Sequence, residues 1–269
     1  MNWHDPDTRG KFIIGILAFI ALSIIGFTVY KKVTKPYFDN SNCETVGENN
    51  PRRKSVQQYV ILIDQSEALN QTQRKYAYNS VKDLLFNSLY KGDRIALFTF
   101  HKDKFSALES VISLCKPQAK ANPIFENPRK IKEHLENNFL IPFEKELSNQ
   151  LSQAFGLESP IFEAIQSVSL SREIDSNDKG RHLIMVSDLL HHTSEYSMYR
   201  DPIDFNWFVK NKEDYYKRIR SDLSGWDITI IYLLRNNANG IQVGNSHIQF
   251  WIDFLQKAGV RVSRVEKVQ

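Results

Sequence analysis

Two short stretches decide the fold: YVILID at residues 59–64 and RHLIMVSD at residues 181–188. The first contains an apolar run rich in β-branched residues, the second contains the apolar run LIMV, and each stretch ends in an aspartate. Unbroken runs of this kind are typical of strands buried on both faces of a parallel sheet. We therefore predict two central strands with carboxylates at their C-terminal ends.

The rest of the chain after residue 59 alternates between strand and helix patterns. RIALFTF at 94–100, DITIIYLL at 227–234 and residues 260–265 predict further strands, and residues 105–114 predict an edge strand or a strand pair. Helical spacing covers 70–90, 128–155, 160–172, 204–223 and 246–258, and Pro142 should break or bend the second of these helices. The alternation predicts an α/β fold with a doubly wound, mostly parallel sheet flanked by helices.

An uncharged segment, FIIGILAFIALSIIGFTVY, occupies residues 12–30 near the N-terminus. As a helix it is long enough to cross a hydrocarbon core of about 30 Å. It exceeds the apolar part of a cleaved signal peptide, and no small-residue cleavage site follows it. We predict a tail at 1–11, a single transmembrane helix at 12–30, a turn-rich linker at 31–58 and an α/β domain at 59–269.

Composition is that of a globular protein, with 42% hydrophobic and 25% charged residues among 269. The net charge of +4 is small, and much of the basic excess lies beside the apolar segment, where it can meet anionic headgroups. The chain shows no zinc-finger or RNA-binding signature, so we expect a membrane and no nucleic acid as a partner.

Charge and cysteines give opposite indications of which side of the membrane the domain occupies. Lysines 31, 32 and 35 outnumber the basic residues before the helix, which weakly favours a cytoplasmic domain. A short N-terminal tail before a large domain favours the outer side, as do Cys43 and Cys115 if they form a disulfide. We expect the domain on the periplasmic or extracellular side rather than in the cytoplasm. For the cysteines, the alternative to a disulfide is two free thiols.

Four oxygen-bearing side chains should meet at one edge of the sheet. Asp64 and Ser66 follow the first strand, Ser159 opens a helix and Asp188 follows the third strand. Ligands of doubly wound sheets bind outside the C-terminal ends of the strands. Carboxylate and hydroxyl oxygens suit a hard divalent cation such as Mg²⁺.

Three motifs in the same order resemble those of the von Willebrand factor A domain family over roughly residues 59–265. DQSEA at 64–68 is similar to the family's Asp-x-Ser-x-Ser, SPIFEA at 159–164 to its Thr-Pro-Leu-Tyr-x-Ala, and SDL at 187–189 to its Thr-Asp-Gly. The resemblance implies a metal-ion-dependent adhesion site for Mg²⁺ or Mn²⁺ made by Asp64, Ser66, Ser159 and Asp188. Ala68 replaces the last serine of the first motif, so the site is degenerate and should bind metal weakly or not at all.

Other candidate sites have little support. His191 and His192 offer a further pair of metal ligands, and Cys115 offers a nucleophile with nothing local to activate it. The aromatic-rich segment at 196–208 should pack in the core or bind a protein. P-loop, GxSxG and GxGxxG signatures are missing from the sequence.

The resemblance implies a protein-binding domain rather than an enzyme. We expect a membrane-anchored protein-interaction or scaffold module with a protein partner in a membrane-associated complex. One alternative is a metal-dependent phosphoesterase or other hydrolase that uses Asp64 as nucleophile and Asp188 as metal ligand. The other is a metal-free structural subunit of a membrane complex.

Overall fold

The computed structural model describes residues 6–33, 37–47, 50–53, 56–123, 126–156, 158–174 and 180–269. They fall into two compact units. One unit comprises residues 1–39 with 44–52, and the other comprises residues 40–43 with 53–269.

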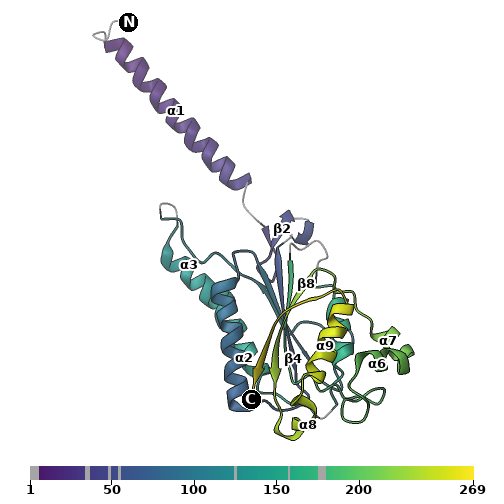
Figure 1. Cartoon of the computed structure of the whole chain (residues 1–269). Helices are drawn as coiled ribbons and strands as arrows, with labels where there is room; N and C mark the ends of the chain where they lie inside the picture. Colours follow the sequence, from purple (N-terminus) through teal and green to yellow (C-terminus); the bar gives the residue numbers. More distant parts are fainter. Residues whose placement is uncertain are drawn as a thin grey trace. The chain divides into compact units, whose positions relative to one another are not determined.

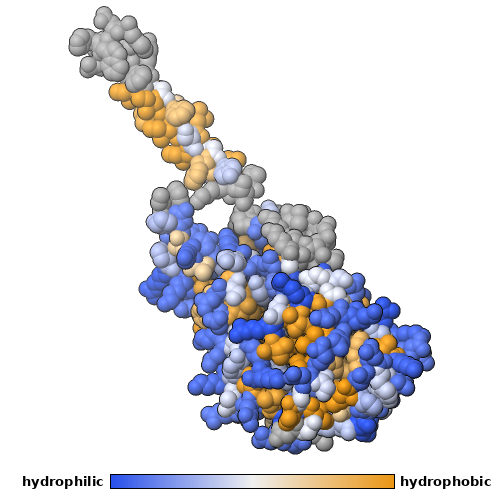
Figure 2. All heavy atoms as spheres, in the orientation of Figure 1, coloured by the Kyte–Doolittle hydropathy of each residue, from blue (hydrophilic) through white to orange (hydrophobic). Residues whose placement is uncertain are grey.

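The first unit contains the helix α1, Pro6–Val33. Its segment Ile13–Tyr30 has a mean hydropathy of 2.5 over 18 residues, and none of these residues is buried. Figure 2 shows the apolar side chains that cover the surface of this helix. Buried core helices of soluble proteins hide such side chains, so this exposed apolar surface is consistent with a membrane anchor.

Three short strands occupy part of the predicted linker at 31–58. They are β1, Tyr37–Phe38; β2, Glu44–Gly47; and β3, Asn50–Arg53, and they form a sheet in the order β1-β2-β3. The antiparallel register pairs Tyr37 with Thr45. Asn42 has a φ of 58°, a conformation that asparagine tolerates well in the tight turn between β1 and β2.

The second unit is built on a six-stranded sheet in the order β6-β5-β4-β7-β8-β9 (Figure 1). The strands are β4, Gln57–Asp64; β5, Arg94–Phe100; β6, Ile112–Cys115; β7, Gly180–Ser187; β8, Trp226–Leu233; and β9, Arg261–Val268. All neighbours are parallel except β6, which pairs antiparallel with β5 at the edge. The predicted fold class, a mostly parallel sheet flanked by helices, is confirmed.

Each face of this sheet packs against its own set of helices (Figure 1). One core gathers side chains of α2, Gln71–Asp83, and α4, Ile141–Gln150. The opposite core gathers those of α5, Ile161–Ser169; α6, Phe205–Asn211; α7, Glu213–Ile219; and α9, Ser246–Lys257. Its centre is Phe162, whose ring centroid lies 4.8 Å from that of Trp251 and 4.7 Å from that of Phe254.

Several boundaries differ from the sequence prediction. Pro142 does not break the helical segment: α3, Pro128–Leu135, passes through a π-helical turn, Glu136–Leu140, into α4, where Pro142 lies in the first turn. Proline is tolerated there because it removes few helical hydrogen bonds. The predicted helix at 204–223 is divided into α6 and α7 at Lys212, whose ψ of 37° is not helical.

Candidate functional site

The two aspartates lie at the ends of two neighbouring strands from which the chain continues to opposite faces of the sheet. Asp64 ends β4 and Asp188 follows β7, and these two strands are parallel neighbours. From β4 the chain enters α2 on one face of the sheet, whereas from β7 it enters α6 on the other. This divergence is the topological switch point, where doubly wound sheets bind their ligands.

Asp64 is buried and uses both carboxylate oxygens. Its Oδ1 accepts a hydrogen bond of 2.9 Å from the backbone N–H of Ser66. Its Oδ2 accepts hydrogen bonds from the hydroxyl of Ser159 at 2.9 Å and from that of Ser187 at 2.8 Å. Three loops are therefore joined through one carboxylate.

The environment of Asp64 disfavours its charged form. Burial, and then the negative charge of Asp188, raise the pKa of Asp64 to about 6 against the lowering effect of the Ser66 and Ser187 hydrogen bonds. A buried carboxylate near a second one is expected to behave in this way.

Asp188 has a different partner, the guanidinium of Arg235. The Nε atom of Arg235 donates to Oδ2 of Asp188 at 2.7 Å, and the side chains of both residues are less than a tenth exposed. The Nη1 atom of Arg235 donates to the carbonyl oxygen of Ala68 at 2.7 Å. Arg235 thus links the loop after β8 to the loops after β4 and β7.

Gln242 holds this arginine in place. Its Oε1 accepts from the backbone N–H of Arg235 at 2.7 Å. Its Nε2 donates to the carbonyl oxygens of Asp188 at 2.9 Å and Leu233 at 3.0 Å. Both ends of the amide are bonded, so the backbone that carries Arg235 is fixed.

The structure brings the four predicted residues to one edge of the sheet and adds two that sequence reasoning missed. Ser187 is the last residue of β7, and its position beside Asp188 in the quoted motif was an available signal. Arg235 lies two residues beyond the last residue of β8, so a search for polar residues after every strand would have found it.

The residues at this edge do not form a fitting set of ligands for Mg²⁺ or Mn²⁺. One oxygen of Asp188 is bonded to a guanidinium, whose positive charge would repel a dication. Ala68 has no hydroxyl, and both oxygens of Asp64 already accept hydrogen bonds.

The other predicted candidates have structural roles. His191 is fully buried; its Nδ1 accepts from the backbone N–H of Ile161 at 3.2 Å, and burial holds its pKa well below the usual value. His192 exchanges backbone hydrogen bonds with Ser159. Cys115 forms a disulfide with Cys43, with Cα atoms 4.9 Å apart, so it offers no free thiol.

Two aromatic side chains remain exposed beside the buried polar cluster. Phe155 is 44% exposed, and its backbone N–H donates to the carbonyl oxygen of Gln65 at 2.8 Å. Tyr199 is also 44% exposed. Its ring centroid lies 5.5 Å from that of His192, which exchanges backbone hydrogen bonds with Ser159. Its pKa is raised to about 12 by partial burial and then by the charges of Asp188 and Glu67.

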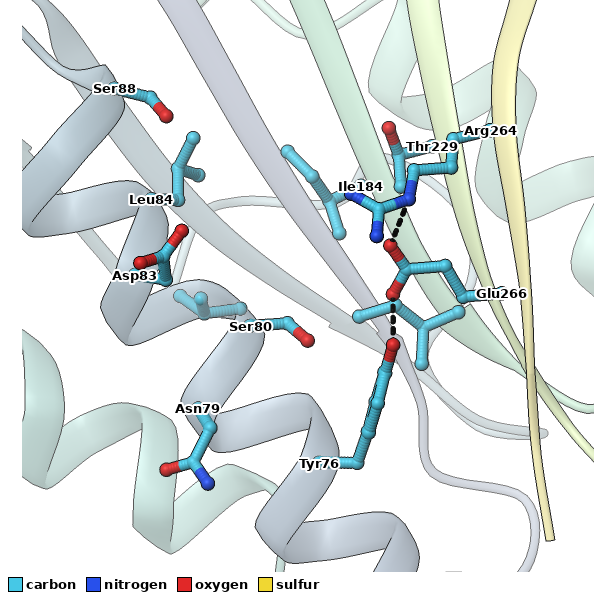
Figure 3. A pocket seen from close by; sticks show the side chains of 12 residues that line it. Tyr76, Asn79, Ser80, Asp83, Leu84, Ser88, Ile184, Thr229, Arg264 and Glu266 are labelled. Carbon is cyan, nitrogen blue, oxygen red and sulfur yellow. Dashed lines mark hydrogen bonds and ion pairs between the residues drawn. The ribbon is translucent and has the colours of Figure 1, made fainter.

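Elsewhere, a groove of about 600 Å³ lies between α2 and strands β7–β9 (Figure 3). Figure 3 shows Tyr76 joined to Glu266, which in turn contacts Arg264. The Tyr76 hydroxyl donates to Oε2 of Glu266 at 2.7 Å. The groove contains none of the predicted site residues, and these three side chains bind one another.

No known protein family matches the sequence, and no curated protein matches it either. Among solved structures, the chain is similar to the SpRpn10 VWA domain at 13% identity, covering 79% of this chain and 87% of that one, with a TM-score of 0.37. It is also similar to an aerotolerance-related membrane protein from Bacteroides fragilis at 13% identity, covering 80% and 92%, with a TM-score of 0.35. A third likeness, to the human COPII-coat protein Sec24c, has 10% identity, covers 84% of this chain and 31% of that one, and has a TM-score of 0.32.

The α/β unit is a doubly wound, mostly parallel sheet flanked by helices. Its strand order places the three quoted motifs after β4, before α5 and after β7, where they meet at one edge. The family resemblance itself stays a prediction from these motifs.

Proposed function

We propose that this chain is a membrane-anchored protein-interaction module that binds its partner at the C-terminal edge of the sheet. The observation that carries this proposal is the pair Phe155 and Tyr199, two large aromatic side chains that are nearly half exposed beside the polar cluster. Exposed aromatic residues are enriched at protein interfaces, where they become buried and contribute much of the binding energy.

The geometry favours binding over hydrolysis. A nucleophilic aspartate needs a free oxygen directed at the substrate, whereas both oxygens of Asp64 accept hydrogen bonds from Ser66, Ser159 and Ser187. Asp188 has its charge balanced by Arg235 rather than by a metal that would activate water. These contacts support a rigid binding surface.

We place the α/β unit on the outer side of the membrane. The Cys43–Cys115 disulfide supports this placement, because structural disulfides persist in oxidising compartments and are rare in the cytosol. The exposed apolar helix at Ile13–Tyr30 supports the anchor.

Photo-crosslinking in intact membranes tests the proposal. A photoreactive amino acid would be introduced into the full-length chain at position 155, 199 or 90. Tyr90 is the matched control, because it is an aromatic residue with 76% exposure that precedes β5, at the opposite edge of the sheet. We expect a discrete crosslinked protein from positions 155 and 199 and none of the same size from position 90.

Two results would count against this surface. One is an identical crosslinked band from all three positions, and the other is no band from positions 155 and 199. As a further check, Tyr199→Ala should reduce the crosslink from position 155, whereas Tyr90→Ala should leave it unchanged.

A further inference from the structure

We propose that Arg235 is a built-in cation that replaces a divalent metal at the switch point, so that the sheet edge is organised without any metal ion. This goes beyond the proposed function, because it concerns the charge balance of the site and holds whichever partner binds there.

The contacts of Arg235 are those expected of a central cation. Its guanidinium bonds to Asp188 through Nε and to the carbonyl oxygen of Ala68 through Nη1, both at 2.7 Å. It also lies 3.6 Å from a carboxylate oxygen of Glu67. One positive group therefore contacts oxygens from two separate loops, as a bound metal ion would.

The contact made by Ala68 is consistent with the replacement of a divalent metal by Arg235. The family motif has a hydroxyl at this position, whereas here the residue contributes its carbonyl oxygen to the arginine. The carbonyl oxygen is a backbone acceptor, so this contact with the guanidinium does not depend on a side-chain hydroxyl at position 68. At position 68 the chain thus offers the arginine a backbone oxygen and has no hydroxyl to offer a metal.

Charge supplies the physical reason for a permanent cation. Asp64 and Asp188 are both buried, and an unpaired buried carboxylate strongly destabilises a fold. Arginine stays protonated at any physiological pH, and Gln242 holds its backbone in place. The guanidinium offsets the charge of Asp188, and it would repel a dication entering beside it.

The test uses the full-length chain in detergent and measures two quantities. The first is direct binding of Mn²⁺ at millimolar concentration, monitored as the loss of the electron paramagnetic resonance signal of free Mn²⁺. The second is the thermal unfolding midpoint in EDTA, Mg²⁺ or Mn²⁺. The variants are Arg235→Gln, Asp188→Asn and the control Arg218→Gln, which removes a surface arginine paired with Glu195.

We expect wild type to show no Mn²⁺ binding that is lost in Asp188→Asn. It should unfold at the same temperature in EDTA, Mg²⁺ and Mn²⁺. Arg235→Gln should unfold at a lower temperature in EDTA and recover part of the loss in Mn²⁺, since a ligand that binds only the folded state stabilises it. Arg218→Gln should behave as wild type.

The proposal is overturned if wild type binds Mn²⁺ and Asp188→Asn abolishes that binding. It is also overturned if Arg235→Gln unfolds at the wild-type temperature in EDTA. Should Arg235→Gln fail to fold, the Mn²⁺ measurement on wild type and Asp188→Asn decides the question alone.

Discussion

The hydroxyl of Ser159 lies 2.9 Å from Oδ2 of Asp64, although 95 residues separate the two in the chain. Ser187 donates to the same oxygen at 2.8 Å. Both hydroxyls are buried, so no bulk water replaces a hydrogen bond that is lost there. The stability of the edge should therefore depend on each serine.

Ser159→Ala should lower the free energy of unfolding by about 1–3 kcal/mol, because it leaves a buried carboxylate oxygen short of one donor. Urea denaturation of the full-length chain in detergent measures this change. Ser152→Ala is the matched control, since its exposed hydroxyl donates to the carbonyl oxygen of Asn149, three residues earlier. Equal stabilities for the two variants would show that the Ser159 contact does not contribute.

Unfolding should depend on pH through His247. Burial lowers the pKa of His247 to about 4 from its usual value of 6.5, so the folded chain holds this imidazole neutral. Above pH 6.5 the neutral His247 makes its full contribution to the free energy of unfolding. As the pH falls below 6.5, His247 becomes protonated in the unfolded chain but stays neutral in the folded chain. The free energy of unfolding therefore declines until the pH passes about 4.

The difference between these two pKa values corresponds to about 3 kcal/mol. His247→Gln should show a smaller loss of stability between pH 7 and pH 4 than wild type, measured by urea denaturation at each pH. His134→Gln, at an exposed position on α3, should keep the wild-type slope. A slope in His247→Gln as steep as that of wild type would assign the pH dependence to other groups.

Thiol labelling should report the Cys43–Cys115 bridge and the side of the membrane together. After acid trapping in cells and denaturation, neither cysteine should react with a maleimide until reductant is added. By the loop-entropy model, closing a loop of this length stabilises the fold by about 4 kcal/mol. Cys43→Ser and Cys115→Ser should therefore lower the unfolding midpoint equally. Two freely labelled cysteines in wild type would indicate a cytoplasmic domain.

The chain should remain in the membrane pellet after carbonate or high-salt washing. The segment Ile13–Tyr30 is strongly apolar on average and carries no charge, so its insertion does not depend on ionic contacts. Replacing both Ile20 and Ile24 by lysine should release the protein, because each buried charge costs about 2.5–3.5 kcal/mol on insertion scales. Recovery of wild type in the wash would rule out a transmembrane anchor.

The sequence alone was enough for the central strands and for the aspartates that follow them. Apolar runs such as YVILID reflect burial on both faces of a sheet, and this is a local property that periodicity reveals. The length and lack of charge of the segment at 12–30 likewise predicted the apolar helix. Motif order then placed Asp64, Ser159 and Asp188 at one edge, since parallel strands share that edge.

Only the tertiary structure decided which groups pair there. Arg235 reaches Asp188 across 47 residues and Ser187 turns its hydroxyl to Asp64, because the loops after β4, β7 and β8 follow paths that spacing does not encode. Pro142 follows closely on the π-helical turn Glu136–Leu140, a feature that the helical spacing of the sequence did not predict. Strand periodicity is set by neighbours within a few residues, whereas the partner of a buried charge is set by packing across the whole fold.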